Sequence, residues 1–297
     1  MGPLLFSIFV NDLPRSLTCK VVLYADDSAI MFSSDNADEM SSVLNDDLLS
    51  VEKWLKRNKL SLNVSKTKYM ICSTERSVQN FSNVSLSIHD TEIERVTSFK
   101  YLGTWIDPIL KWDEHVINTS KKISQRIGFI SRLRKSLPPK VTKLLANSLV
   151  MPYFDYCNLV WNNCTNELRN KLQVLQNRLA RIILYEGPRA HVSDMLNQLS
   201  WRNLNDRSQF NLILLVHKCL TGNTPDYLKE TINYVNAHHS YGTKSSSNLS
   251  LYHNKVKTQA GKRTFHYRGT TAWNNLPPDI RSISNSDVFK QVLRNMY

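Results

Sequence analysis

The chain has 297 residues, of which 41% are hydrophobic and 21% charged, and its formal net charge is +13. This composition excludes a disordered chain and leaves room for two or three folded domains. We expect neither a membrane span nor a secretory signal, because no apolar run reaches about 18 residues and no basic segment precedes the apolar N-terminus.

The cysteines indicate a reducing compartment. They are odd in number and widely spaced, with no Cys-x-x-Cys pair, and they stand at Cys19, Cys72, Cys157, Cys164 and Cys219. A disulfide framework needs paired cysteines, whereas cytoplasmic and nuclear proteins keep their thiols reduced. We therefore expect an intracellular protein of the cytoplasm or nucleus.

Positive charge gathers in the middle and at the end of the chain. Residues 1–110 carry 11 Lys and Arg against 14 Asp and Glu, residues 111–189 carry 14 against 5, and residues 190–297 carry 13 against 6. This distribution favours an anionic polymer, above all nucleic acid, as the partner. A basic surface that only faces solvent explains the same charge equally well.

The first predicted elements are a short helix and a hairpin. Pro3 near a first turn and Pro14 as a stop predict a short buried helix over the apolar residues 4–10. Two β-prone runs, residues 20–24 and 28–32, flank Ala25-Asp26-Asp27, which predicts a β-hairpin with the acidic pair in its turn. Because both runs are almost wholly apolar, we expect strands that are covered on both faces.

An amphipathic helix and several short strands follow. Asn36 and Glu39 have the spacing of a capping box, and apolar residues then recur at helical period to about residue 58. The polar segments 60–68 and 74–83 predict loops. Strands are expected over residues 69–72, 84–88, 92–96 and 100–106, and His89-Asp90 is expected to join the second to the third.

From Asp113 onward the pattern is helical. An apolar stripe runs from Val116 to Leu137. The other faces of this helix carry basic side chains at Lys121, Lys122, Arg126, Arg132, Arg134 and Lys135. Further helices are expected over residues 141–150 and 167–184, and one or two more over residues 193–220.

The last part of the chain is less regular. Residues 236–264 show little periodicity and predict a mobile connection. The apolar segments 265–276 and 288–293 are expected to pack back onto the body. The sequence thus predicts an α/β region over residues 1–110, a basic helical domain over residues 111–189 and a mostly helical C-terminal domain over residues 190–297.

Asp26 and Asp27 are the strongest candidates for chemistry. An arbitrary Asp-Asp pair is usually just a turn, since Asp favours turns. Here the pair ends two apolar strands, and a bound cation would remove the repulsion between the adjacent carboxylates. Mg²⁺ binds one or two carboxylates together with substrate phosphates, and polymerases use two such ions for nucleotidyl transfer. That arrangement needs a further carboxylate from a neighbouring strand.

Tyr24-Ala25-Asp26-Asp27 between apolar runs resembles the signature turn of reverse transcriptases. Other segments resemble, in the same order, the non-LTR retrotransposon polymerases of the jockey and CR1 kind. These segments are the palm helix at residues 2–14, the loop at residues 62–67, the primer-grip segment at residues 98–103 with residues 112–115 after it, and residues 273–277 of the C-terminal region. The resemblance covers most of the chain, and it implies a partial reverse-transcriptase palm, then a helical thumb and a C-terminal domain.

The resemblance also implies roles for individual residues. Asp26 and Asp27 would be catalytic carboxylates that bind Mg²⁺ or Mn²⁺, with Asp26 as the direct ligand. Tyr24 and Lys66 would lie beside the primer end and the incoming deoxynucleoside triphosphate, although a solvated loop lysine explains Lys66 equally well. The primer would be held by Phe99, Lys100, Tyr101, Leu102 and Gly103. The basic helix faces would follow a duplex of RNA template and DNA primer.

The chain also departs from the family pattern. Family members carry a first catalytic aspartate on a strand upstream of the palm helix, and neither that strand nor the Gln-Gly pair ahead of Gly2-Pro3 is found. The resemblance therefore implies an RNA-directed DNA polymerase that is truncated before this aspartate and inactive alone, a relic that need have no partner in the cell. Two alternatives stay open: a non-catalytic nucleic-acid-binding remnant module, and a misfolding fragment with no role.

Overall fold

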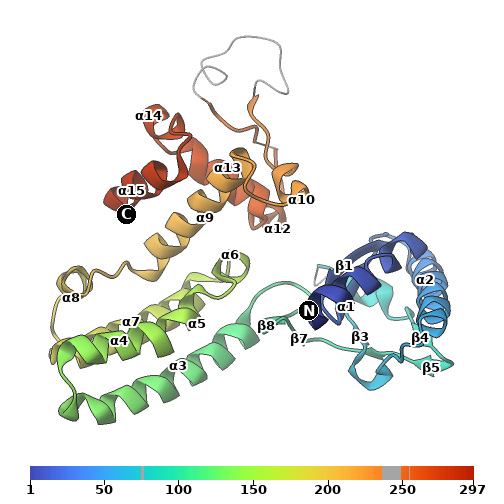
Figure 1. Cartoon of the computed structure of the whole chain (residues 1–297), viewed down its shortest axis with the longest axis horizontal. Helices are drawn as coiled ribbons and strands as arrows, with labels where there is room; N and C mark the ends of the chain where they lie inside the picture. Colours follow the sequence, from blue (N-terminus) through green and yellow to red (C-terminus); the bar gives the residue numbers. More distant parts are fainter. Residues whose placement is uncertain (75–76, 236–248, 254) are drawn as a thin grey trace. The chain divides into compact units, whose positions relative to one another are not determined.

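The computed structural model describes residues 1–74, 77–235, 249–253 and 255–297. The chain divides into two compact units, Met1–Glu114 and His115–Tyr297, and Figure 1 follows it from blue to red. The first unit combines helices with short strands, and the second is helical in its described residues apart from one isolated β-bridge. The expected α/β head and helical remainder are therefore confirmed, whereas a further division near residue 190 stays a prediction.

The first unit is built from α-helices, short 3-10 helices and paired strands. Its helices are α1 (Gly2–Val10), α2 (Ala37–Arg57) and the 3-10 helices Leu13–Ser16, Val64–Lys66 and Val78–Phe81. Its strands are β1 (Lys20–Tyr24), β2 (Asp27–Met31), β3 (Lys68–Tyr69), β4 (Ser87–Ile88), β5 (Thr91–Glu92), β6 (Glu94–Arg95), β7 (Phe99–Tyr101) and β8 (Thr104–Ile106). The pairs β1–β2, β4–β5 and β7–β8 are antiparallel hairpins, and β3 pairs with β6 in parallel.

Helix α2 organises the core of the first unit. The N-cap half of the predicted capping box is confirmed, since the Asn36 side chain accepts hydrogen bonds from the backbone N–H groups of Asp38 and Glu39. The backbone N–H of Asn36 itself donates to the Ser34 hydroxyl and not to Glu39. Val51 and Trp54 on the inner face of α2 then pack into one cluster with Val84 and Ile88 beside β4. This burial fixes α2 against the segments that precede and follow it.

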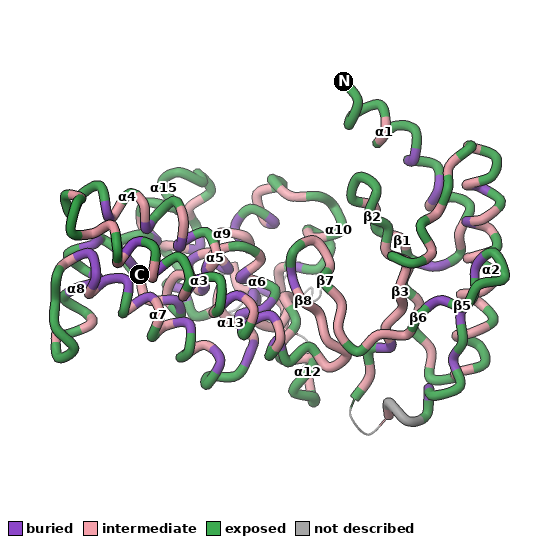
Figure 2. Tube along the Cα trace, turned by 90° about the horizontal axis from the view of Figure 1, so that it is seen from below, coloured by how far each residue is buried: buried purple, intermediate pink, exposed green. Residues whose placement is uncertain are grey.

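Helix α1 departs from the expectation of a buried helix. Leu4, Leu5 and Ile8 are 67%, 60% and 65% exposed, and only Val10 is buried. Figure 2 shows α1 exposed along most of its length. The prediction of burial was wrong because α1 meets the core of its unit mainly at its C-terminal end, where Phe9 contacts the Trp54 ring edge-on.

The hairpin of β1 and β2 is confirmed, but its strands are not covered on both faces. Val22, Tyr24 and Met31 are 43%, 64% and 45% exposed. The two strands pair only with each other in the part of the chain that the structure describes. A two-stranded ribbon without a third strand leaves both of its edges open, so apolar sequence alone did not guarantee burial here.

Residues 100–106 form a hairpin, so the single strand expected there was wrong. Leu102 and Gly103 make the two-residue turn between β7 and β8 with φ angles of 45° and 83°. Positive φ at both central residues is the pattern of a type I′ turn, which suits the twist of paired strands. His89 and Asp90 make a similar turn between β4 and β5, with φ angles of 50° and 57°.

The second unit is a set of packed helices. They are α3 (Asp113–Leu133, which begins in the first unit), the 3-10 helix Arg134–Ser136, α4 (Pro139–Leu149), α5 (Met151–Asp155), α6 (Asn158–Trp161), α7 (Asn166–Leu184), α8 (Val192–Gln198), α9 (Leu204–Leu220), α10 (Asp226–Lys229), α12 (Gln259–Lys262), α13 (Phe265–Asn274), α14 (Pro278–Arg281) and α15 (Ser286–Met296). The predicted stripe of α3 is confirmed, because Ile123, Ile127 and Ile130 are fully buried. Among the described residues no helix is long and apolar enough to cross a membrane.

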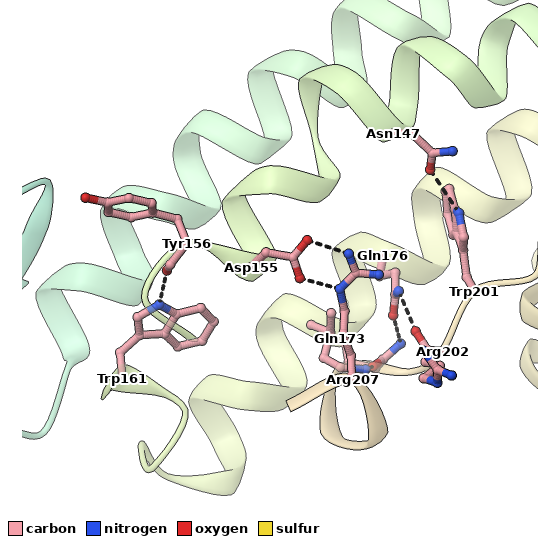
Figure 3. Close-up of polar contacts among 10 residues, drawn as sticks. Asn147, Asp155, Tyr156, Trp161, Gln173, Gln176, Trp201, Arg202 and Arg207 are labelled. Carbon is pink, nitrogen blue, oxygen red and sulfur yellow. Dashed lines mark hydrogen bonds and ion pairs between the residues drawn. The ribbon is translucent and has the colours of Figure 1, made fainter. Parts of the chain in front are cut away.

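Polar contacts join distant helices of the second unit, as Figure 3 shows. Arg207 on α9 forms a two-bond ion pair with Asp155 on α5. The indole N–H of Trp201 donates to the Asn147 side chain on α4 at 3.0 Å. The Gln176 side chain on α7 donates to the Arg202 carbonyl at 2.9 Å. The segment before α9 is therefore held to both α4 and α7.

Part of the segment expected to be a mobile connection is structured. Leu251 is 1% exposed and forms a β-bridge with Tyr234, and α12 follows. Residues 236–248 and 254 lie outside the described residues. Leu251 belongs to the core cluster that also contains Trp273 and Phe289, so α13 and α15 pack onto the body as expected.

Candidate active site

The hairpin of β1 and β2 carries the acidic pair to an exposed turn. Tyr24 pairs with Asp27, so Ala25 and Asp26 form the two-residue loop. Ala25 has a φ of 52°, a region that glycine usually fills because a Cβ is unfavourable there. Asp26, Asp27 and Tyr24 are all exposed. The predicted carboxylates are thus accessible at the tip of a hairpin whose turn stores some backbone strain.

A buried carboxylate fixes the start of this hairpin. Asp47 on α2 is 3% exposed and accepts hydrogen bonds from the backbone N–H groups of Thr18 at 3.0 Å and Cys19 at 2.8 Å. Its burial alone would raise the pKa of Asp47, but the hydrogen bonds from Thr18 and Cys19 outweigh burial and hold that pKa below its usual value. Asp47 therefore connects α2 to the residues that lead directly into β1.

Sequence reasoning missed Asp47, although a signal was present. Leu44, Leu48 and Val51 define the inner face of α2, and Asp47 falls on the same face by helical period. A carboxylate on an apolar face must find hydrogen-bond donors when it is buried. Such a residue can be recognised in a sequence as a break in an otherwise apolar stripe.

The hairpin of β7 and β8 lies near the acidic turn. Burial and then the nearby charge of Asp27 raise the pKa of the Tyr101 phenol. The Tyr101 hydroxyl has no hydrogen-bond partner in the described part of the chain. Among the other residues predicted to hold the primer, Phe99 and Leu102 are half-buried, whereas Lys100 and Gly103 are exposed. The Asp27 carboxylate thus lies within electrostatic range of the Tyr101 phenol.

Lys66 lies in the short 3-10 helix Val64–Lys66, which begins at Asn63. The Asn63 side chain accepts a hydrogen bond from the backbone N–H of Lys66 at 3.2 Å, and the Lys66 side chain is exposed. Within the described residues no hydrogen bond or ion pair joins Lys66 to the acidic turn. Its role at a triphosphate stays a prediction.

The acidic turn offers a divalent metal ion two carboxylates, Asp26 and Asp27. In the described ranges, no group of three or more His, Cys, Asp or Glu side chains could hold a metal ion. Asp12 is engaged elsewhere, because it accepts a hydrogen bond from the Trp54 indole at 3.1 Å. Asp26 and Asp27 suit one ion that is shared with substrate phosphates, and they fall short of the ligands that two ions require.

The basic residues of the second unit differ in their exposure and in their contacts with other side chains. Lys121, Lys122, Arg132 and Lys135 are exposed. Arg126 is exposed too, but its Nε donates to the Tyr153 hydroxyl at 3.2 Å. The guanidinium of Arg134 is half-buried over the Tyr185 ring, 4.4 Å from its centroid, and donates to the Ile182 carbonyl. Arg134 therefore holds the end of α3 to the end of α7, a role that its place in a basic run did not reveal.

Comparisons with known proteins point in one direction. Residues 1–106 match the family model described as reverse transcriptase (RNA-dependent DNA polymerase). The chain is 26% identical over 194 residues to the probable RNA-directed DNA polymerase from transposon BS of Drosophila melanogaster, a match that covers 62% of this chain and 21% of the relative.

Two further relatives carry similar names. The RNA-directed DNA polymerase from mobile element jockey of Drosophila melanogaster is 23% identical over 70% of this chain and 24% of its own length. The Retrovirus-related Pol polyprotein from type-1 retrotransposable element R1 2 of Nasonia vitripennis is 25% identical over 54% of this chain and 41% of its own length. The chain thus spans less than half of each relative. No solved structure matches it.

Proposed function

We propose that this chain, a relative of the RNA-directed DNA polymerases of non-LTR retrotransposons, supplies the metal-binding hairpin, the primer-holding hairpin and the duplex-binding helices of such an enzyme. In this proposal residues 1–110 are part of the palm, residues 111–189 the thumb and residues 190–297 a C-terminal domain. The exposed Asp26-Asp27 turn carries the proposal, because carboxylates at an accessible hairpin tip suit a divalent ion bound to substrate phosphates.

The roles assigned to single residues follow from this placement. Asp26 and Asp27 bind Mg²⁺ or Mn²⁺, and Tyr24 and Lys66 lie toward the primer end and the incoming deoxynucleoside triphosphate. The residues from Phe99 to Gly103 hold the primer on its RNA template. The electrostatic effect of Asp27 on Tyr101 supports placing both hairpins in one polymerase site.

By itself the 297-residue chain is proposed to be inactive. Nucleotidyl transfer with two metal ions needs carboxylates beyond Asp26 and Asp27, and the described residues gather no third one beside them. A further carboxylate ligand would then have to come from outside the metal-binding hairpin. The metal-binding half of the site can still be tested without turnover.

Mn²⁺ binding to the whole chain tests the hairpin directly. Electron paramagnetic resonance counts free Mn²⁺ during a titration of the wild type, Asp26→Asn and the control Asp35→Asn, an exposed aspartate just after β2. We expect Asp26→Asn to weaken binding at least tenfold, and Asp35→Asn to change it by less than twofold. Equal Mn²⁺ affinity in all three proteins would contradict a metal site at the Asp26-Asp27 turn.

Primer extension tests the inactivity. The purified chain is incubated with an RNA template, a DNA primer, deoxynucleoside triphosphates and Mg²⁺ or Mn²⁺, and no extension is expected. Extension that disappears in Asp26→Asn but not in Asp35→Asn would contradict the proposed inactivity and support the polymerase function itself.

A second candidate function is nucleic-acid binding without catalysis. The exposed basic residues of α3 favour it, and nonspecific affinity would be on the order of 10⁻⁴–10⁻⁶ M at physiological salt. The triple change of Lys121, Lys122 and Arg132 to Gln should weaken binding to a fluorescent template–primer and flatten its salt dependence. The control is the triple change of Lys53, Lys56 and Arg57 to Gln on α2. If the affinity for the template–primer did not depend on salt concentration, this function would be excluded.

A further inference from the structure

The C-terminal part of the second unit contains a pocket that none of the proposed polymerase roles uses. Its volume is about 470 Å³, within the range of small-molecule sites. Residues from α9, α13, α14 and the loop after α14 line it, together with Tyr234 and Leu249. Its polar lining includes His217, Thr221, Arg281 and Ser282.

Arg281 is the unusual residue of this pocket. Its side chain is 8% exposed, and its Nη1 donates to the Ser250 hydroxyl at 2.8 Å. Its Nε is buried without a hydrogen-bond partner in the described part of the chain, and no ion pair with a carboxylate is formed there. A buried guanidinium that is held by one neutral hydroxyl is costly, because a buried charge needs an opposite charge and full hydrogen bonding.

The neighbours of Arg281 do not compensate its charge. None of the residues that line the pocket is acidic. His217 is held neutral at pH 7, since burial lowers its pKa, and its Nε2 is engaged with the Ile283 carbonyl at 2.9 Å. Ser282 also lines the pocket, and its hydroxyl donates to the Asp279 carbonyl at 2.7 Å. The lining of the pocket therefore carries a net positive charge, and it includes the planar guanidinium of Arg281 and the neighbouring residue Ser282.

We propose that this pocket binds a phosphate group, either free or as part of a nucleotide. A guanidinium presents several N–H donors in one plane and matches the oxygens of a phosphate, which would supply the missing negative charge. The half-buried Tyr234 and the apolar Leu220 give a nucleoside a surface next to the phosphate. The inference goes beyond the proposed polymerase function and depends on none of its residues.

Isothermal titration of the whole chain tests the proposal, with inorganic phosphate and a deoxynucleoside monophosphate as probes at constant ionic strength. Arg281→Met keeps the length of the side chain and removes the charge. The matched control is Arg294→Met, which removes one exposed positive charge from α15. We expect Arg281→Met to weaken binding at least tenfold and Arg294→Met to change it by less than twofold. Tighter binding of the nucleotide than of phosphate would mark the nucleotide as the ligand, and equal binding would mark the phosphate alone.

A second variant keeps the test decisive if Arg281→Met does not fold. Arg281→Lys retains the buried charge but cannot form two parallel bonds, so we expect phosphate binding to weaken several-fold. Far-UV circular dichroism verifies the fold of each variant. No binding by the wild type, or equal affinities for the wild type and both Arg281 variants, would overturn the phosphate site.

Discussion

The phenol of Tyr101 lies close enough to the Asp27 carboxylate for that charge to raise its pKa, in addition to the larger effect of burial. Tyr101 ends β7, and Asp27 begins β2 directly after the acidic turn. Two hairpins that are distant in the sequence therefore approach each other within the first unit.

Asp27→Asn should lower the pKa of Tyr101 toward its ordinary value, because the carboxylate disfavours the phenolate. The pKa is measured by NMR with ¹³C-labelled tyrosine, and the Tyr101→Phe variant assigns the signal. Asp26→Asn is the control, since Asp26 is not among the causes of the shift. An unchanged titration of Tyr101 in Asp27→Asn would show that the hairpins do not approach each other in solution.

Asp47→Asn should destabilise the first unit by about 2 kcal/mol, because Thr18 and Cys19 lose a charged acceptor in a buried place. Urea unfolding measures the change. Asp46→Asn replaces the exposed neighbour on the same helix and should cost less than about 0.5 kcal/mol.

The same carboxylate should give the first unit an acid-sensitive stability. The pKa of Asp47 is depressed in the folded protein, so its contribution is present above the unfolded pKa of about 4 and is lost as pH falls through the folded value. The wild type should therefore lose more stability than Asp47→Asn when pH is lowered below 4. Parallel acid profiles of the two proteins would contradict this assignment.

Gly103→Ala should destabilise the β7–β8 hairpin by about 1–2 kcal/mol, since Gly103 has a φ of 83° that a Cβ disfavours. The matched control is Gly128→Ala in the interior of α3. A Cβ there would approach only the end of the Arg132 side chain, at 3.9 Å. That change should stabilise the protein by about 0.5–1 kcal/mol. If both substitutions changed the midpoint of thermal unfolding equally, the positive φ of Gly103 in the β7–β8 turn would be contradicted.

His115 should make the second unit less stable in mild acid. Burial, and then the charge of Lys122, lower the pKa of His115 to about 4. In the unfolded chain His115 is protonated near pH 6.5, whereas in the folded chain it is protonated only near pH 4. The free energy of unfolding therefore falls as pH drops through this window. Between pH 7 and 5 the loss from this residue is about 2 kcal/mol. His115→Gln should remove that part of the pH dependence in urea unfolding.

Local patterns in the sequence determined most of the elements. The Asn36 cap, the stripe of α3 and the hairpin around Asp26-Asp27 depend on residues that are close in the chain, and each was confirmed. The family relation could also be reached from short segments, because their order along the chain is itself information. The roles of single site residues stay predictions.

Other features required contacts between distant residues. The apolar sequence of α1 predicted burial, but burial needs a partner surface, and in the described structure only Phe6 and Val10 of α1 pack against the core cluster. The turn at Leu102-Gly103 divides a β-prone run because pairing of β7 with β8 outweighs the tendency to continue one strand.

The sequence by itself determined a family, an order of elements and an acidic hairpin turn, since periodicity and turn chemistry are local properties. Only the tertiary structure decided which charges are enclosed. Asp47 accepts hydrogen bonds from Thr18 and Cys19, the charge of Asp27 acts on Tyr101, and the buried Arg281 donates to the Ser250 hydroxyl. Burial and electrostatic interaction depend on distances in space, and these emerge only when segments far apart in the chain pack together.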